Sequence, residues 1–539
     1  MGMGRPTAGM LVCLLLAGCG GTRGPGPARP DTATDPASPP VGVAAATVPS
    51  LPAASHAAPV DPASAATPSP TRSHWQSPGD GAPRIGAIQH GTMIWEEPVR
   101  DRQRLAIGRI RIGTTVKLKT GEPLAGQGCF GSWFEIEPFG YVCEDETTTR
   151  DFSTPYWRAL ASLAPHDGPL PYRYAYSMGA PMYHRLPTAE EQHKNEYWTY
   201  PKKRAFRALG TWAKTHEKLV VKDTDEGLIR PSDPVPEFFL GHESIPGSPY
   251  KSRAPKAKEL PAGSGVAYAK AFEAAGRTWL LTPELLLVPA DRVFAYAPST
   301  FHGVELDDET RLPLAWIRGD AEPCRSGSTL EPTSERWPNK THVLLTGARQ
   351  RRADRTFWET REHDCWIEEH DGTAIVRPVD RLPGNLGGDE RWIDARILTG
   401  YAVAYIGLKP VWTSLWSGGK GGVPVHGNDP KQFATTEVGI FTFQWKEKVA
   451  TMSPDPGEPT VFWFADVPHV QYVRAPLALH VAYWHESFGQ LMSAECLNFS
   501  PRDGEWLHAF TDPPLPPGWN AVRGSKLTGR ASRIVIRPQ

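Results

Sequence analysis

The stretch LHVAYWHESFGQLMSAECLNFSPRD, residues 479–503, contains the two side chains that say most about this chain, His480 and Cys496. They lie between strand-like runs of apolar residues. A thiolate is the nucleophilic form of cysteine, and a nearby imidazole can generate it. The pair therefore indicates a cysteine nucleophile, Cys496. His480 would be its base and would later protonate a leaving amine.

A helix is predicted directly after this pair. Ser500 can cap it, Pro501 suits the first helical position, and Asp503 lies where a capping box places its acid. The apolar face of the helix would be formed by Trp506, Leu507 and Phe510. Cys496 is thus expected on a loop or strand end just before a helix N-terminus.

The first residues resemble a bacterial lipoprotein signal. Arg5 precedes an apolar stretch, residues 8–17, which is too short to span a bilayer. The run LAGC, ending at Cys19, resembles a lipobox. By that resemblance the signal 1–18 is removed and Cys19 carries the lipids, whereas the alternative is an ordinary signal peptide. Gly20 is not the Asp that retains such proteins in the inner membrane. We therefore expect an exported lipoprotein on the outer membrane, facing the periplasm.

Residues 19–82 are predicted to be a disordered tether behind the anchor. Ala, Pro, Thr and Ser dominate it, a composition that cannot bury enough apolar surface to fold. Pro-rich chain extends by about 3.1 Å per residue. No later stretch has the length and apolarity of a membrane helix. The formal net charge of -1 gives no electrostatic case for nucleic acid as a partner.

Cysteine parity singles out one thiol. The chain has seven cysteines; Cys13 leaves with the signal and Cys19 would be lipidated. An exported compartment favours disulfides between neighbours in the remaining set. The pairs expected are Cys129 with Cys143 and Cys324 with Cys365. Cys496 is then the odd thiol, which is either reactive or buried and inert.

The folded part is predicted to be mainly β, with small barrels in its first half. Residues 83–150 alternate strand-like runs with Gly and Pro, and GCFGSWFEIEPFGYVC, residues 128–143, resembles a bacterial SH3-type domain. Residues 168–388 look like two weaker modules of this type with a polar insertion, in which a helix is possible around 202–219. Such modules often grip peptidoglycan in wall proteins; packing or spacer roles are the alternative.

Residues 389–522 contain further motifs in a fixed order. The runs RWIDARI and YAVAY alternate like strands. PVWTSLWSGGKGG, residues 410–422, and TTEVGIFTF, residues 435–443, follow before His480. This order resembles the L,D-transpeptidases, the YkuD-type enzymes that remodel peptidoglycan. The resemblance implies that these residues form a YkuD-like β catalytic domain with few helices, following the SH3-like small barrels. Their opening has a Ser-Gly-Gly-Lys-like turn, then Thr-Pro-x-Gly-x-Phe, with Glu437 here in the place of Pro. Residues 523–539 are set apart as a C-terminal tail.

The box around Cys496 departs from the family pattern. The family has Ser-His-Gly-Cys, an apolar residue and Asn; Ser493, Cys496 and Asn498 match, while Ala494 and Glu495 stand for His and Gly. A positive φ at Glu495 would cost about 1–2 kcal/mol. Its carboxylate also opposes ionisation of the adjacent thiol, because like charges disfavour each other.

The resemblance implies a substrate and a site. Cys496 would attack a tetrapeptide stem of peptidoglycan before its terminal D-Ala, and the acyl-enzyme would pass the stem to another stem, a protein lysine or water. Backbone N–H groups near Cys496 would hold the oxyanion. Ser493, Asn498, Tyr483 and Trp484 are candidates for shaping the cleft.

No cofactor is implied, and the spacing of the histidines around residue 480 is not that of a zincin, so no metal is expected. The altered box leaves an alternative open, a catalytically degenerate lipoprotein that binds the cell wall. The sequence carries no indication of oligomeric state.

Overall fold

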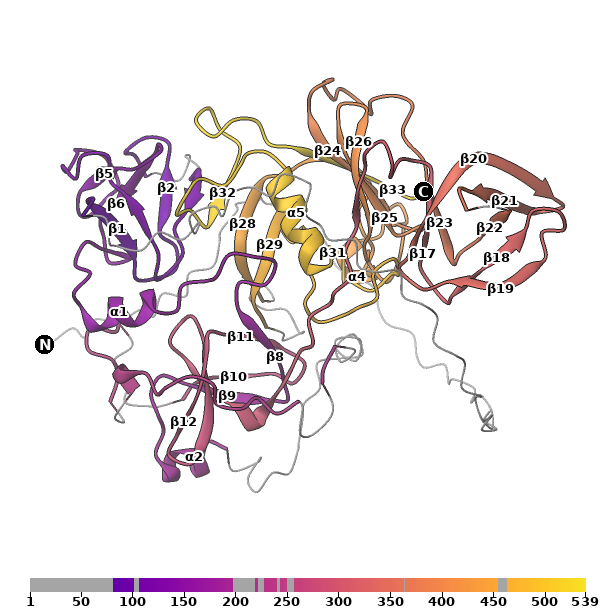
Figure 1. The fold of residues 1–539 in the computed structure, drawn as a ribbon. Coiled ribbons are helices and arrows are strands. Elements are labelled where there is room, and N and C mark those ends of the chain that lie inside the picture. Colours follow the sequence, from indigo (N-terminus) through magenta and orange to yellow (C-terminus); the bar gives the residue numbers. More distant parts are fainter. Residues whose placement is uncertain are drawn as a thin grey trace, which may run out of the picture. The chain divides into compact units, whose positions relative to one another are not determined.

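The structure is a computed structural model that describes residues 81–100, 106–196, 219–221, 227–239, 243–249, 256–362, 364–453 and 463–539. Cys19, most of the tether and residues 202–218 of the possible helix lie outside the described residues. The described chain is mainly β, as the sequence predicts (Figure 1). Its α-helices are α1 (Pro155–Ala161), α2 (Ala189–Asn195), α4 (Pro430–Phe433) and α5 (Pro501–Phe510). No helix among these residues is long and apolar enough to cross a membrane.

A six-stranded sheet forms the centre of the C-terminal part. Its strands, in spatial order, are β16 (Val304–Glu305), β26 (Lys409–Leu415), β25 (Tyr401–Ile406), β24 (Arg391–Arg396), β33 (Arg533–Arg537) and β27 (Gly439–Thr442). Side chains alternate between its two faces, as strand geometry requires. Along β25, Ala402 and Ala404 enter one buried cluster, whereas Tyr401, Val403 and Tyr405 enter another. Both faces of this sheet are therefore covered.

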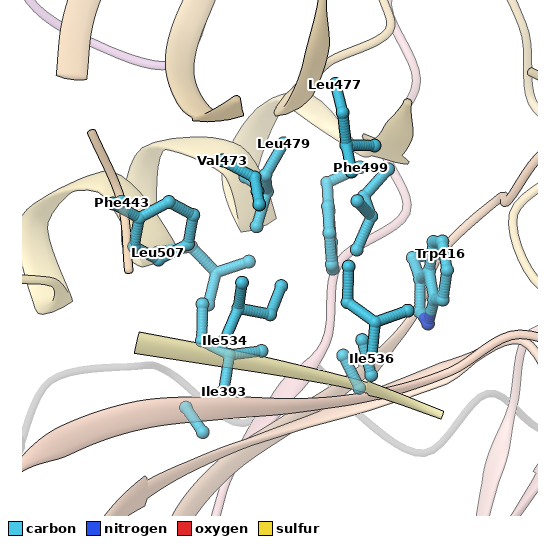
Figure 2. Close-up of a cluster of buried hydrophobic side chains, with 14 of the residues drawn as sticks. Ile393, Trp416, Phe443, Val473, Leu477, Leu479, Phe499, Leu507, Ile534 and Ile536 are labelled. Carbon is cyan, nitrogen blue, oxygen red and sulfur yellow. The ribbon is translucent and has the colours of Figure 1, made fainter. Parts of the chain in front are cut away.

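One of these clusters, here called the inner core, supports the region of Cys496 (Figure 2). It lies between the six-stranded sheet and a layer made of α5, β30 (Leu477–Val481) and β31 (Leu497–Phe499). Its members include Ile393, Ile534, Ile536, Leu477, Leu479, Leu497, Phe499 and Leu507. Burial of each such side chain contributes about 1.5–3 kcal/mol.

Helix α5 begins where the sequence predicts. Ser500 caps it by accepting a hydrogen bond from the N–H of Asp503, and Pro501 is in the first turn. The Asp503 carboxylate accepts hydrogen bonds from the Gly303 N–H and the Ser414 hydroxyl, each at 2.6 Å. The helix is thereby fixed to the strand β26 and to the segment before β16.

A twelve-stranded sheet connects segments that are far apart in sequence. Its main path runs β15-β8-β11-β29-β28-β32-β3-β2-β6-β5, and β30 and β31 extend from β29. The bounds are β2 (Met93–Trp95), β3 (Gly108–Arg109), β5 (Trp133–Glu135), β6 (Tyr141–Cys143), β8 (Arg173–Ser177), β11 (Gly265–Tyr268), β15 (Val293–Ala295), β28 (Trp445–Met452), β29 (Phe464–Arg474) and β32 (Ala521–Val522). Strands of the predicted catalytic region thus continue into both preceding regions.

The N-terminal β region shares its core with the end of the chain. Strands β1 (Arg84–Ala87), β4 (Thr115–Lys117) and β7 (Thr148–Thr149) form a separate three-stranded sheet. Trp519 is fully buried in the cluster that contains Phe134 and Val142. A Cβ at Gly108 would lie 2.3 Å from the Trp519 ring, so only glycine lets the indole approach β3. The SH3-type assignment of this region stays a prediction.

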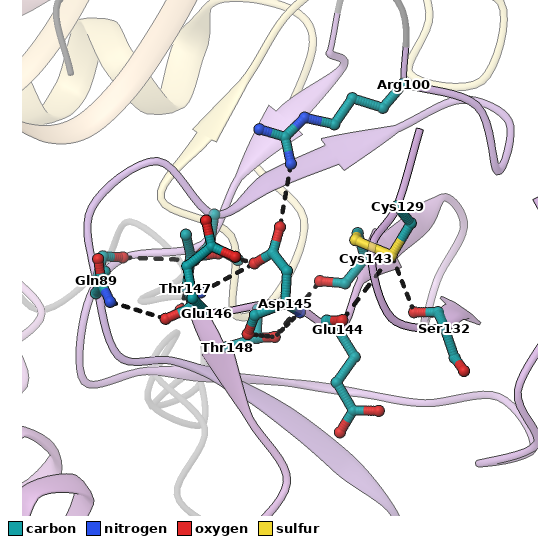
Figure 3. Close-up of polar contacts among 11 residues, drawn as sticks. Gln89, Arg100, Cys129, Ser132, Cys143, Glu144, Asp145, Glu146, Thr147 and Thr148 are labelled. Atoms are coloured by element: carbon teal, nitrogen blue, oxygen red, sulfur yellow. Dashed lines mark hydrogen bonds and ion pairs between the residues drawn. A yellow bond between two sulfur atoms is a disulfide. The ribbon is translucent and has the colours of Figure 1, made fainter. Parts of the chain in front are cut away.

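A disulfide and an ion pair organise the loops of this region (Figure 3). Cys129 is bonded to Cys143 at the end of β6. Two residues later, the Asp145 carboxylate lies 3.0 Å from Arg100 and accepts hydrogen bonds from the N–H and hydroxyl of Thr147. These contacts fix the turn between β6 and β7.

Two further sheets complete the described chain. A five-stranded sheet has the order β10 (Lys256–Leu260), β9 (Ala180–Tyr183), β14 (Leu287–Pro289), β13 (Arg277–Leu281) and β12 (Lys270–Ala274). A seven-stranded sheet has the order β19 (Pro332–Trp337), β18 (Glu322–Ser326), β22 (Cys365–Glu369), β21 (Arg355–Thr360), β20 (His342–Arg352), β17 (Leu314–Ile317) and β23 (Thr373–Val376). Within the second sheet Cys324 is bonded to Cys365.

The proposed C-terminal tail requires correction. Residues 523–539 contain β33, which pairs in parallel with β24 and antiparallel with β27. Ile534 and Ile536 are buried in the inner core. The segment is therefore an interior strand of the six-stranded sheet, because its apolar side chains have a matching face to cover.

Candidate active site

His480 and Cys496 are carried by neighbouring parallel strands. In the pairing of β30 with β31, Leu479 is opposite Leu497 and His480 is opposite Asn498. Alternation sends the leucines into the inner core, so His480, Asn498 and Cys496, which precedes β31, project from the other face. The structure records no hydrogen bond between His480 and Cys496 among the contacts of its described residues. The pair shares a face without a hydrogen bond between the two side chains.

The imidazole of His480 is in the protonation state that a general base needs. Its Nδ1 lies 3.0 Å from the backbone oxygen of Val481, a contact that requires the ring proton on Nδ1. The Nε2 lone pair is therefore available to take a proton. Burial lowers the pKa of His480 to about 4, so the ring is neutral at pH 7.

The thiol of Cys496 is held protonated. Cys496 is the free cysteine of the described chain, it is half-buried, and its Sγ lies 3.6 Å from the backbone oxygen of Pro476. Burial, together with the charge of Glu495, raises the pKa of this thiol to about 12. A substrate or a conformational change must therefore assist formation of the thiolate.

The Ser-Gly-Gly-Lys turn is bound directly to the segment around Cys496. Ser417 and Asn498 exchange backbone hydrogen bonds of 2.9 and 3.0 Å. The Lys420 N–H donates to the Ser493 carbonyl at 2.9 Å. The Ser493 hydroxyl in turn donates to the Cys496 carbonyl at 2.5 Å. Ser493 thus shapes the loop by local hydrogen bonding.

The threonine motif closes the same loop from the other side. The hydroxyl of Thr436 accepts from the Gly419 N–H at 2.8 Å and donates to the Glu495 carbonyl at 2.7 Å. One side chain therefore connects the glycine turn with the residue before the nucleophile. Three motifs that are separate in sequence meet at Cys496.

The two acidic departures from the family pattern share one partner. Glu495 is only 4% exposed, and its Oε1 lies 3.1 Å from Nη2 of Arg474. The same guanidinium pairs with Glu437 at 2.5 Å. Glu495 does not adopt a positive φ, so the strain considered for this position is absent. Burial raises the pKa of its carboxyl group, while Arg474 opposes that shift.

Asn498 is held by His485, whose part in the site was not predicted from sequence. His485 is buried; its Nδ1 accepts from the Ser487 N–H, and its Nε2 lies 3.0 Å from the Asn498 side-chain amide. A neutral imidazole that accepts at Nδ1 donates at Nε2. This tautomer favours the Asn498 carbonyl facing His485. The amide nitrogen, which the structure places next to His485, then exchanges positions with Oδ1, an atom that is buried and has no hydrogen-bond partner among the described residues.

Tyr483 and Trp484 lie beneath the site rather than at an open surface. They are 1% and 5% exposed, in an aromatic cluster that includes Tyr174 of β8. The rings of Tyr174 and Tyr483 stack at 4.0 Å between centroids, and the His480 ring lies 5.7 Å from that of Trp484. Of the two, Trp484 is the ring that neighbours the His480 imidazole.

The described residues contain no group of three or more His, Cys, Asp or Glu side chains placed to hold a metal ion. The candidate site therefore comprises a thiol, a neutral imidazole, an amide and backbone groups. Such a set can perform acyl transfer through a covalent thioester.

Comparisons with known proteins give partial structural similarities. No protein-family model matches the sequence, and no curated protein matches it. Three similar solved structures are L,D-transpeptidases. One, from Enterococcus faecium, is 15% identical and covers 28% of this chain and 50% of its own, with a TM-score of 0.20. Another, from Mycobacterium smegmatis, is 19% identical; the match covers 36% of this chain and 78% of the other, with a TM-score of 0.21.

The third is L,D-transpeptidase 3 from Mycobacterium tuberculosis in complex with a faropenem-derived adduct, which is 16% identical and covers 36% and 78%, with a TM-score of 0.19. This chain thus spans half the length of the E. faecium protein. At these TM-scores the similarity does not bear on activity.

Proposed function

We propose that this protein is a peptidoglycan L,D-transpeptidase that acts through an acyl-enzyme on Cys496. The observation that carries the proposal is the meeting of three motifs at one loop. The three motifs follow one another in the chain in the order that resembles the family. They are the turn from Ser417 to Lys420, Thr436, and the segment from Ser493 to Asn498, and they hydrogen-bond to one another around Cys496.

The chemistry follows from the protonation states. Nε2 of His480 removes the Sγ proton of Cys496 as sulfur attacks the carbonyl carbon before the terminal D-Ala of a tetrapeptide stem. The C–N bond then breaks, His480 returns the proton to the leaving D-Ala amine, and a thioester remains. An incoming amine attacks the thioester and releases Cys496. His480 takes the proton of that amine and returns it to the Cys496 sulfur, which restores the thiol and the neutral imidazole.

Two groups are suited to stabilise the oxyanion. Glu495 lacks a positive φ, so its backbone retains an ordinary conformation at the place where the family has Gly. Alternation places the Asn498 side chain on the same side of the strands as Cys496. Donors fixed before the reaction stabilise developing charge without reorganisation.

The decisive experiment is mass spectrometry of the purified full chain after incubation with a tetrapeptide stem or a carbapenem. We expect an adduct on Cys496 and none in Cys496→Ala. His480→Ala should slow adduct formation about 10²–10⁴-fold, the usual contribution of a positioned base. An equally fast reaction in Cys496→Ala would exclude the mechanism.

A second function, a degenerate lipoprotein that binds the wall, is favoured by the raised thiol pKa and by the lack of a hydrogen bond between His480 and Cys496. The double substitution Ala494→His with Glu495→Gly separates the two. If the natural chain forms no adduct and the double variant does in an unchanged fold, the protein is a binding protein. The lipid anchor at Cys19 and the periplasmic location belong to either proposal, and Cys19→Ala should release the protein from the membrane fraction.

A further inference from the structure

A cavity of about 550 Å³ lies apart from the catalytic pair. One wall is formed by the residues after β17 and by the turn between β22 and β23. The opposite wall contains Leu398, Gln490 and Leu491. The last two belong to the loop that leads to Ser493. The volume is in the range of small-molecule sites.

One wall of the cavity carries a fixed cation, Arg318. Its Nε donates to the Asp371 carbonyl at 2.6 Å, and its Nη1 donates to the carbonyls of Leu398 and Gly489 at 2.7 and 2.9 Å. In the described part of the chain, no carboxylate lies within ion-pair distance of this guanidinium. A rigid guanidinium that binds only carbonyls is suited to receive a carboxylate from a ligand.

The same wall carries a buried carboxylate that is only partly satisfied. Glu322, at the start of β18, is 6% exposed, and its Oε2 lies 2.9 Å from Nε2 of His370. Its Oε1 is buried and has no hydrogen-bond partner among the described residues. A buried acceptor without a donor is unfavourable, so a ligand N–H would be stabilising there. Asp320 adds an exposed carboxylate to the same cavity.

We propose that this cavity binds the zwitterionic head of an aliphatic amino acid. The ligand carboxylate pairs with Arg318, its ammonium group with Glu322 and Asp320, and its hydrocarbon chain lies against Leu398 and Leu491. The head can belong to a free amino acid or to the side-chain end of a diamino dicarboxylic residue in a peptide. The site is independent of acyl transfer at Cys496.

Isothermal titration calorimetry of the full chain carrying Cys496→Ala tests the proposal without chemistry at the thiol. Norleucine has the required head, N-acetylnorleucine lacks the ammonium, and norleucine amide lacks the carboxylate. We expect each derivative to bind about tenfold or more weakly than norleucine, because each loses one charged hydrogen bond. Equal affinities of the three compounds would overturn the proposal and leave the transpeptidase proposal intact.

Substitutions locate the binding. Glu322→Gln should weaken norleucine about tenfold and leave N-acetylnorleucine unchanged. Asp308→Asn, an exposed acid outside the cavity, is the matched control and should change neither. Arg318→Lys removes the guanidinium but keeps the positive charge, so it is the substitution at this position that disturbs folding least. Norleucine binding that is insensitive to Glu322→Gln and to Arg318→Lys would place the ligand elsewhere.

A peptide whose diaminopimelate side chain ends in the same zwitterion separates the two sources. Tighter binding of the peptide assigns the cavity to a peptide end, and tighter binding of norleucine assigns it to a free amino acid. Failure of both overturns the proposal.

Discussion

The guanidinium of Arg474 lies 3.1 Å from the carboxylate of Glu495, the residue directly before the candidate nucleophile. The same arginine pairs with Glu437, which stands where related motifs have proline. One cation therefore compensates both acidic departures. Glu495 therefore has a charged partner and is not an unpaired buried carboxylate.

Removing the Glu495 charge should make the thiol more reactive. Because that charge raises the pKa of Cys496, Glu495→Gln should increase the iodoacetamide rate at pH 7.5 about two- to tenfold. Glu437→Gln is the control, since it touches the same arginine but does not adjoin the thiol. A slower reaction in Glu495→Gln would contradict this account.

The reactivity of Cys496 should rise steadily with pH. Its pKa is raised to about 12, so the thiolate fraction grows about tenfold per pH unit below that value. Iodoacetamide rates between about pH 7 and 10 should follow this slope, with Cys496→Ala as the blank. A plateau below about pH 8 would reveal a thiol activated by His480.

Loss of the arginine should destabilise the fold. Arg474→Gln leaves the buried Glu495 carboxylate without its partner, at a cost of about 1–3 kcal/mol after allowance for the partial exposure of Arg474. Urea unfolding measures this change. The double variant Arg474→Gln with Glu495→Gln should recover most of the lost free energy of unfolding. If the effects of the two single substitutions simply add, Arg474 and Glu495 are not coupled.

The last strand should carry substantial stability. Ile536 is 1% exposed in the inner core, so Ile536→Ala should lower the free energy of unfolding by about 2–5 kcal/mol. Leu527, which is 43% exposed, provides the control, and Leu527→Ala should change it by about 0.5 kcal/mol or less. Similar effects of the two substitutions in denaturant unfolding would contradict the buried position of β33.

The sequence pattern predicted those elements whose formation depends on residues close together in the chain. Alternation in residues 401–405 predicted a strand, and β25 lies there with large and small side chains on opposite faces. The signals at Ser500 and Pro501 predicted the start of α5. These features depend on neighbours in the chain, which a sequence displays directly.

Features that depend on distant partners were missed. The run RIVIR at 533–537 is rich in β-branched residues, a strand signal, yet its parallel partner β24 lies far earlier in the chain. The shared role of Arg474 has no local pattern at all. The bond between His485 and Asn498 could have been considered, since a buried polar pair needs partners, but the tautomer argument requires coordinates.

The place of β33 has a consequence for biosynthesis. Until β33 has been synthesised, β24 lacks its parallel neighbour and the inner core lacks Ile534 and Ile536. From the synthesis of β24 until that of β33, the nascent chain therefore carries an open strand edge and uncovered apolar surface. Synthesis of β33 is the event that allows the sheet to close.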